Sequence, residues 1–386
     1  MNQTIKIGFL FPYSSVSPHM SQDIIDGFFT SIPEIYRKNF QFYPEYIDKG
    51  SHELVKVAVN KLIMFHNVDI ISGIVSYKLM PEINSILERQ KKLAFFFDLG
   101  EYLPPLAPIS ENIFFNSLQF WQVEYALGLW AQKQFSGKGA ILMSIYEAGY
   151  QMHSAFWQGA LSAGAEEIDM HILPFNPQLP NIEDILSPFF EKIKQSKVDY
   201  FHALFCGSEA FEFYKCYCQS DIYNKIPLVV TPYMASDETL DNVPKSNITL
   251  YSASTWNYNS MDEKNQRFKS AYQLRTGKKA SEFAVMGYEM GQLFLPMLPI
   301  FQKKDLKEII KYIKDASVNG PRGLRNFHHD STLAPPIINI EKITTLNDKL
   351  SRIVLEQGIA LKHNDSVFYD IHTQCVSGWK NPYLCV

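Results

Sequence analysis

Residues 5–11 read Ile-Lys-Ile-Gly-Phe-Leu-Phe and are followed by Pro12. A run of β-branched and aromatic residues that ends at a proline is typical of a buried strand and a loop. The next apolar segment has helical spacing, with side chains at Ile25, Phe28, Phe29 and Ile32. We therefore expect a strand followed by a helix at the start of the chain.

The same alternation continues through the first third of the chain. We expect further strands at Phe40–Ile47, Val68–Ser72, Leu93–Phe97 and Asn112–Phe115. A helix between the first two should have one apolar stripe, formed by Leu54, Ala58, Leu62 and Phe65. Alternating strands and helices predict a parallel sheet that is covered by helices on both faces.

After a long helix over about residues 121–134 the pattern restarts. The next expected strands are Ala140–Ile145, Ile168–Leu173, Asp199–Phe205, Pro227–Thr231 and Thr249–Ser254. The later helices exceed what one such half needs, so some of them should return to the first half. A chain of 386 residues is also longer than one hydrophobic core usually organises.

The sequence therefore predicts an α/β protein with two doubly wound parallel-sheet lobes joined by a multi-strand hinge. The N-terminal lobe is expected to comprise residues 1–118 and 252–322. The C-terminal lobe is expected to comprise residues 119–251 and 323–345. Residues 346–386 are expected to form a C-terminal extension.

Composition and motifs exclude several functional classes. The formal charge of -4 and the scattered basic residues give no reason to expect a nucleic-acid partner. No window has the roughly 18 consecutive apolar residues that a membrane span needs, so we expect no direct membrane insertion. The sequence contains no nucleophile elbow, phosphate-binding loop or zinc-protease motif. We therefore expect no enzymatic activity, no cofactor and no metal; the adjacent His328 and His329 would point opposite ways.

The sequence leaves the cellular compartment open. Residues 1–6 lack the features of a secretory signal, so the protein is either cytoplasmic or an exported protein from which the signal was removed. Cys375 and Cys385 flank a turn and could form a disulfide in an oxidising compartment. Cys206 is more consistent with a buried, unreactive thiol.

Several segments, taken in order, resemble one family. They are the strand Ile5–Gly8 with its Pro12 turn, the segment Asp69–Ser76, the segment from Lys269 to Ala284 with Tyr288, and Asn319-Gly320-Pro321-Arg322-Gly323 followed by Phe327, His329 and Asp330. This order resembles the type I periplasmic-binding-protein fold of ABC transporters, in its branched-chain amino-acid and amide receptor branch. The resemblance covers roughly residues 4–343. It implies two lobes that close on a small ligand like a clamshell.

Two strand-end segments in equivalent places are candidates for ligand contact, one in each half. They are Ser72–Ser76, which Tyr77 follows, and Cys206-Gly207-Ser208. Glycine lets backbone approach a ligand closely, and a serine at a helix start offers a hydroxyl beside free N–H groups. Ser76 and Ser208 could equally cap their own helices.

The next strand-end loop reads Asp98-Leu-Gly100-Glu101-Tyr102, where relatives often carry Ser, Pro, Gly, Ala and Thr. A carboxylate here would balance a bound ammonium group, because a buried cation needs a hydrogen-bonded partner. Glu101 could instead be an ordinary exposed acid, and Asp98 could cap the turn. The departure from the family pattern argues against an aliphatic amino acid as the ligand.

Tyrosines supply the remaining candidates. Tyr146 and Tyr150 lie in a turn that resembles the family turn whose aromatic side chain covers the ligand, although Tyr150 could simply pack at a helix start. Tyr233 stands where amino-acid receptors often place an acid. Tyr13, with Ser14 and Ser15, lies on the first loop, which could contact ligand or face solvent.

The resemblance implies the receptor of an ABC-type importer, which captures an amino acid, amide or related metabolite and presents it to a membrane permease. This function would place the protein in the periplasm. The tail, with its Trp and Asn-Pro-Tyr residues, resembles the amide-sensing branch, so the alternative is a cytosolic sensor that acts through a protein partner. A third alternative is an interaction module that has lost ligand binding.

Overall fold

The computed structural model describes residues 4–174, 182–243, 247–327, 335–346, 349–362, 365–374 and 378–384. His328, His329, Asp330, Cys375 and Cys385 therefore lie outside the described residues. The chain divides into two compact units. Unit 1 comprises residues 1–119, 256–336 and 379–386, and unit 2 comprises residues 120–255 and 337–378.

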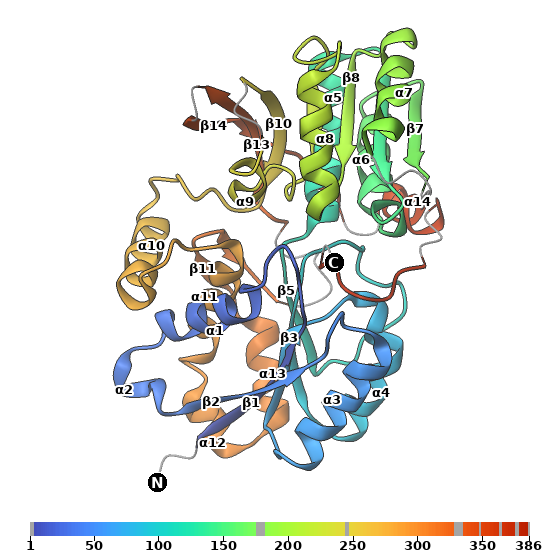
Figure 1. The fold of residues 1–386 in the computed structure, drawn as a ribbon. Helices are drawn as coiled ribbons and strands as arrows, with labels where there is room; N and C mark the ends of the chain where they lie inside the picture. Colours follow the sequence, from blue (N-terminus) through green and yellow to red (C-terminus); the bar gives the residue numbers. More distant parts are fainter. Residues whose placement is uncertain are drawn as a thin grey trace. The chain divides into compact units, whose positions relative to one another are not determined.

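Unit 1 contains a five-stranded parallel sheet in the order β2-β1-β3-β4-β5 (Figure 1). Its strands are β1 Ile5–Phe11, β2 Phe40–Tyr46, β3 Ile70–Ile74, β4 Leu93–Asp98 and β5 Ile113–Ser117. Alternate side chains point to opposite faces of the sheet. Leu10, Ile71 and Phe96 join one core cluster, whereas the neighbouring Phe95 packs on Phe294 of the other side. The continuous apolar strands are buried on both faces because helices cover both.

The helices of unit 1 come from both ends of the sequence. They are α1 Met20–Ser31, α2 Glu34–Arg37, α3 His52–Met64, α4 Met80–Arg89, α10 Glu263–Thr276, α11 Glu282–Phe294, α12 Leu298–Lys303 and α13 Leu306–Asp315. A short hairpin of β11 Val318–Gly320 and β12 Gly323–Arg325 follows them. The return of α10–α13 to the first sheet agrees with the expectation that later helices return to the first half.

The buried face of α3 differs from the stripe expected from sequence. Leu54 and Phe65 are exposed, and Val55 and Val59 take their places in the core beside Ala58 and Leu62. The expected stripe shares only its central residues with the real one, because several apolar side chains on α3 allow more than one helical stripe to be drawn.

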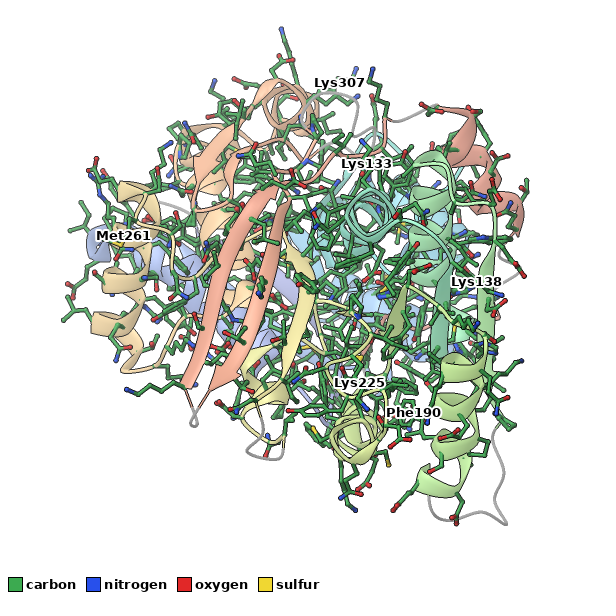
Figure 2. All side chains as sticks on the ribbon, turned by 90° about the horizontal axis from the view of Figure 1, so that it is seen from above. Lys133, Lys138, Phe190, Lys225, Met261 and Lys307 are labelled. Carbon is green, nitrogen blue, oxygen red and sulfur yellow. The ribbon has the colours of Figure 1, made fainter. Side chains whose placement is uncertain are left out.

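Unit 2 contains a seven-stranded sheet in the order β14-β13-β10-β9-β8-β6-β7. The parallel strands are β6 Gly139–Ser144, β7 Ile168–Leu173, β8 Tyr200–Leu204, β9 Leu228–Val230 and β10 Thr249–Ser254. The antiparallel pair β13 Asn339–Leu346 and β14 Lys349–Gln357 adds to the edge beside β10, as Figure 2 shows. The first part of the expected C-terminal extension thus contributes the edge strand β14 to this sheet.

The helices of unit 2 are α5 Phe120–Phe135, α6 Met152–Ser162, α7 Ile182–Gln195, α8 Gly207–Gln219, α9 Asp237–Leu240 and α14 Ser366–Gln374. Together the units confirm the predicted class, a mixed α/β protein with two largely parallel sheets. The expected lobe boundaries stay a prediction; the two units assign residues 323–336 and 379–386 to unit 1 instead. Among the described residues, no helix is both long enough and apolar enough to span a membrane.

Candidate functional site

The carboxyl ends of β3, β4 and β5 meet at one edge of the unit 1 sheet, because these strands are parallel. Gly73 brings β3 to this edge. Its φ is +127°, and a Cβ at this position would clash with the backbone of Leu10 on β1. A glycine is therefore required where the two strands approach most closely. The chain then leaves the sheet at Ser76.

Ser76 is buried and caps the short 3₁₀ helix η1 Tyr77–Leu79. Its hydroxyl oxygen accepts a hydrogen bond of 3.3 Å from the Lys78 backbone N–H. Ser76 therefore caps its own helix, as the alternative interpretation of the sequence predicted. The ring of Tyr77 is also buried, with its centroid 4.4 Å from that of Phe115. Ligand contact by either residue stays a prediction.

Asp98 and Glu101 form a pair of buried carboxyl groups at the ends of β4 and its loop, 1% and 0% exposed. Asp98 Oδ2 accepts a hydrogen bond of 3.1 Å from the Gly100 N–H, so Asp98 does cap this turn. Ser117 lies beside the Asp98 carboxyl group, and the Ser76 side chain and the Gly100 and Tyr383 backbone N–H groups lie beside the Glu101 carboxylate, where they favour the charged form. Glu101 is therefore not the exposed loop acid of the alternative interpretation.

Burial dominates the protonation of this pair. Loss of hydration raises the pKa of Asp98 well above its usual range, and the nearby Glu101 charge raises it further. Burial also raises the pKa of Glu101 to about 7, against the opposing effect of the Ser76 hydroxyl and nearby backbone N–H groups. At neutral pH the pair therefore holds a proton that isolated carboxyl groups would release.

Arg325 of β12 is a buried cation at this edge, and the sequence did not single it out. Its two terminal nitrogens donate to Gln119 Oε1 at 3.2 Å, while its Nε has no hydrogen-bond partner among the described residues. Burial and the neighbouring Arg322 lower the pKa of Arg325 to about 9. Its position, two residues beyond the Gly-Pro-Arg-Gly turn, is the signal that could have identified it.

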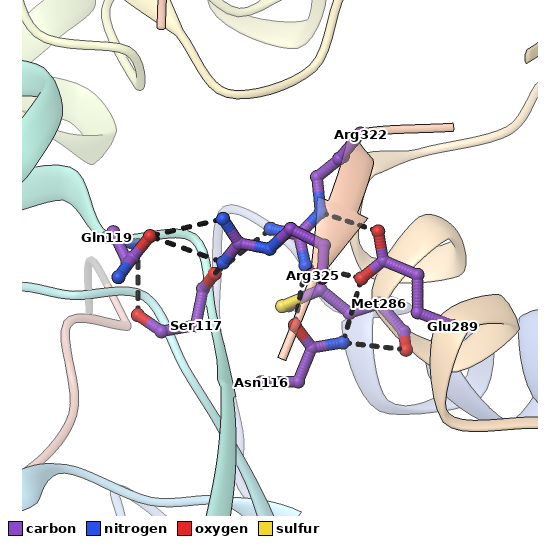
Figure 3. Close-up of polar contacts among 7 residues, drawn as sticks. All are labelled: Asn116, Ser117, Gln119, Met286, Glu289, Arg322 and Arg325. Atoms are coloured by element: carbon purple, nitrogen blue, oxygen red, sulfur yellow. Dashed lines mark hydrogen bonds and ion pairs between the residues drawn. The ribbon is translucent and has the colours of Figure 1, made fainter. Parts of the chain in front are cut away.

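Arg322 braces the end of β5, as Figure 3 shows. Its guanidinium donates to Glu289 Oε1 and Oε2 at 3.0 and 2.5 Å, and its Nη1 donates to the Ser117 carbonyl at 3.0 Å. Asn116 joins the network by donating to Glu289 Oε2 at 3.0 Å. This paired and hydrogen-bonded arrangement is structural, since each charged group already has a partner.

Tyr102 and Tyr13 differ in their surroundings. Tyr102 is buried, and its hydroxyl donates to the Trp379 carbonyl at 2.7 Å. The ammonium of Lys78 lies 4.9 Å from the centre of its ring. Tyr13 is 45% exposed, while the neighbouring Ser14 is buried. The structure thus brings Ser76, Asp98, Glu101 and Tyr102 to one edge and leaves Tyr13 at the surface.

Unit 2 presents an edge of the same kind, where β6 and β8 end. The Tyr150 side chain is buried, and its hydroxyl donates to Tyr146 Oη at 3.1 Å. Gly207 starts α8 with a φ of +58°, and its N–H donates to Tyr233 Oη at 3.3 Å. Ser208 is exposed and does not cap its helix, because the cap position is Cys206. Tyr150 therefore lies just before the start of α6, and the Tyr233 hydroxyl lies at the start of α8.

Acidic side chains that the sequence interpretation did not single out also belong to this second edge. Glu147 is fully buried in the turn after β6, and its N–H donates to Ser144 Oγ at 3.4 Å. Burial raises the pKa of Glu209, in the first turn of α8, and a hydrogen bond from Ser144 opposes the rise. Each unit therefore places acids and tyrosines at the carboxyl edge of its sheet.

The described residues hold no group of three or more His, Cys, Asp or Glu that could bind a metal. A cavity of about 150 Å³ lies at the opposite, amino edge of the unit 1 sheet, beside Ile5, Ile70 and Leu93. Its wall includes Lys92, whose ammonium donates to the Val68 carbonyl at 2.6 Å. This cavity is separate from the strand-end residues described above.

A family model described as periplasmic binding protein matches residues 4–335. Among solved structures, an ABC transporter substrate-binding protein from Sphaerobacter thermophilus is similar, with 19% identity, a TM-score of 0.78, and coverage of 93% of this chain and 98% of that chain. A search of curated protein sequences found no significant match.

Two further similar structures contain ligands. A solute-binding protein of an ABC transporter from R. palustris, in complex with benzoate, has 19% identity and a TM-score of 0.71, covering 92% of this chain and 98% of that chain. A branched-chain amino acid transporter substrate-binding protein from Streptococcus pneumoniae, in complex with isoleucine, has 15% identity and a TM-score of 0.66, covering 92% and 99%. At these identities the likeness establishes the fold.

Proposed function

The chain belongs to the periplasmic binding protein family, and from that premise we propose that it is the substrate-binding subunit of an ABC-type importer. Members of this family are binding proteins and not enzymes. In the proposed function the protein captures a small polar metabolite by hinge closure of its two lobes and presents it to a membrane permease. In this function the protein binds its ligand outside the cytoplasm, where an importer takes up its solute.

One observation carries the proposal: two buried carboxyl groups, those of Asp98 and Glu101, lie at the edge where parallel sheets bind ligands. Burial raises the pKa of both groups, so keeping them charged away from water is costly. N–H donors on a ligand would offset that cost.

The chemistry of the edges also indicates the ligand class. Asp98 and Glu101 in unit 1, and Glu147 and Glu209 in unit 2, are acceptors that favour cationic or N–H groups. Tyr150 and Tyr233 add flat apolar surfaces with polar tips. We therefore assign a ligand with at least one ammonium or amide nitrogen, such as an amino acid, an amide or a related compound.

A thermal-shift screen with matched pairs of compounds tests this proposal. Benzamidine and benzoate share a shape but differ in charge, and isoleucinamide and isoleucine differ at the carboxyl group. Amino acids, short amides and polyamines complete the panel. A ligand at 100 times its Kd should raise the free energy of unfolding by about 2.7 kcal/mol. Hits that carry nitrogen donors are expected. The absence of a thermal shift with every compound would contradict the proposed binding function. Shifts produced only by compounds that carry a carboxylate and no nitrogen would contradict the proposed ligand class.

A further inference from the structure

Two buried arginines meet at the end of β5, and they differ in how their charges are balanced. The guanidinium groups of Arg322 and Arg325 both donate to the Ser117 carbonyl, at 3.0 and 3.2 Å (Figure 3). Glu289 is the ion-pair partner of Arg322. Among the described residues, no carboxylate forms an ion pair with Arg325.

The acceptors that Arg325 does have are neutral. Gln119 Oε1 accepts from both terminal nitrogens at 3.2 Å, and the Ser117 carbonyl accepts from one of them. The Nε–H has no acceptor in the part of the chain that the structure describes, although Arg325 is only 5% exposed. Its pKa of about 9 leaves the group charged at neutral pH. A buried guanidinium normally has a carboxylate partner, because the cation has lost its hydration.

This cation lies beside the carboxyl groups that the proposed function uses. Asp98 on β4 is opposite Ser117 on β5, and the Ser117 hydroxyl lies beside the Asp98 carboxyl group. Burial raises the pKa of the Tyr77 hydroxyl, and the nearby Asp98 and Glu101 charges raise it further. Arg325 opposes this rise, so its guanidinium lies close to the same ring. Acidic groups and a cation therefore share one edge of the unit 1 sheet.

We propose that Arg325 binds the carboxylate of the ligand, so that the ligand is an amino acid or a related zwitterion. The proposal rests on the proposed function, in which Asp98 and Glu101 accept the nitrogen donors of the ligand. The Nε–H of Arg325 donates to a carboxylate oxygen of the ligand, whose negative charge balances the guanidinium. The site then discriminates against the corresponding amide, which has nearly the same shape but offers no negative charge.

Acetate tests the anion site without knowledge of the ligand. It would be titrated into the full chain that carries isotope-labelled arginine, and the Nε–H signals would be followed by NMR. The Arg325 signal, assigned by its loss in Arg325→Gln, should shift until the site is saturated. The Arg322 signal is the internal control, because its Nε already donates to Glu289 Oε1 at 3.0 Å. An Arg325 signal that acetate leaves in place, or that neutral acetamide shifts equally, would overturn the proposal.

Gln119→Glu tests the missing negative charge within the chain. Glutamate has the shape of glutamine and would place a carboxylate oxygen where Gln119 Oε1 now accepts from Arg325. The variant should unfold at a higher temperature than the wild type, because the buried cation gains a partner. Gln273→Glu, at an exposed position of α10, is the matched control and should leave the unfolding temperature nearly unchanged. A lower unfolding temperature for Gln119→Glu would show that Arg325 is already balanced and would overturn the proposal.

Matched ligands test recognition of the carboxylate. Isoleucine, isoleucinamide and every other pair of amino acid and amide in the panel would be titrated calorimetrically into the wild type and Arg325→Gln. The variant should bind amino acids at least tenfold more weakly, because a charge-assisted hydrogen bond is lost. It should bind their amides no more weakly than the wild type does. Equal losses for acids and amides would reduce Arg325 to a positioning residue and overturn carboxylate recognition.

The outcomes separate this inference from the proposed function. If no compound in the panel binds, the proposed function fails, and the acetate titration still decides whether Arg325 is an anion site. If amides bind and amino acids do not, the proposed function holds and carboxylate recognition by Arg325 is wrong. If Arg325→Gln does not fold, Gln119→Glu takes its place in the comparison, since its carboxylate would pair with the guanidinium and should weaken amino-acid binding in the same way.

Discussion

Glu101 shows how one buried side chain links stability to binding. It is fully buried beside Asp98, and burial raises its pKa from 4.5 to about 7. The native chain therefore holds a proton on this group over a pH range in which the unfolded chain has released it. A ligand with an ammonium group would replace that proton.

The pH dependence of stability follows from this difference. Between about pH 4.5 and 7 the native chain binds more protons than the unfolded chain, so the free energy of unfolding should fall as the pH rises. Glu101 alone should contribute a fall on the order of 3 kcal/mol, since one pKa unit corresponds to about 1.4 kcal/mol. Urea unfolding at pH 5 and pH 8 would measure it. Glu101→Gln should flatten the dependence; an unchanged slope would contradict the burial argument.

Arg322 and Glu289 illustrate the opposite case, in which a buried charge is fully paired. Arg322→Leu should lower the free energy of unfolding by about 3 to 5 kcal/mol, because Glu289 would stay buried without its partner. Lys303→Ala is the control. It breaks an exposed pair of 3.2 Å with Glu308 and should cost less than about 1 kcal/mol. Similar losses in the two variants, measured by urea unfolding, would argue against a structural role for the buried pair.

At the scale of residues, the sequence predicted where the candidate residues lie in the fold better than it predicted their burial and their contacts. Ser76 and Glu101 follow strands, and the carboxyl ends of parallel strands meet at one edge, so their proximity could be expected. Arg325 could not be identified in this way. It reaches the edge from a hairpin about 200 residues further along the chain, and only the folded chain shows where that hairpin lies.

At the scale of elements, both units join two helices through glycines. A Cβ on Gly27 of α1 would clash with the Ala284 carbonyl of α11, and one on Gly128 of α5 would clash with the Phe156 carbonyl of α6. The absence of side chains lets each pair of backbones approach closely. The two sheets are therefore covered by equivalent helix pairs, although the glycines lie in unrelated stretches of sequence.

Gly128→Ala tests this packing. The added methyl group should force α5 and α6 apart and lower the free energy of unfolding by about 1 to 3 kcal/mol, despite the better helix propensity of alanine. Lys133→Ala, at an exposed position of the same helix, should stay within about 0.5 kcal/mol of the wild type. Guanidinium unfolding curves would compare them. A Gly128→Ala variant as stable as Lys133→Ala would show that the helices do not require this contact.

The alternation of apolar runs was enough to predict the parallel strands, because a strand buried on both faces must be apolar throughout. It was not enough for α3, whose buried face uses Val55 and Val59 in place of Leu54 and Phe65. The pair β13–β14 was also missed. β14 lies at the edge of its sheet, and most of its side chains are exposed or half-buried, so it lacks the apolar run by which the other strands were recognised.

At the scale of the whole molecule, the route of the chain was the hardest feature to predict. Four crossings connect the two units, at residues 119/120, 255/256, 336/337 and 378/379. The sequence predicted several crossings because one α/β half could not use all the later helices. The last crossing returns Trp379–Leu384 to unit 1, where the Tyr102 hydroxyl donates to the Trp379 carbonyl. Nothing local in Trp379–Leu384 predicts that destination, since its contacts are with loops hundreds of residues away.

The most direct test of the central claim is calorimetric titration of the tightest compound from the panel into the wild type, Ser76→Ala and Ser208→Ala. These serines lie at the carboxyl edges of different units, and each can offer one hydrogen bond. The account predicts one ligand per chain and a three- to tenfold loss of affinity in both variants, because a hydrogen bond contributes about 0.5 to 1.5 kcal/mol. Wild-type affinity in both variants would contradict it.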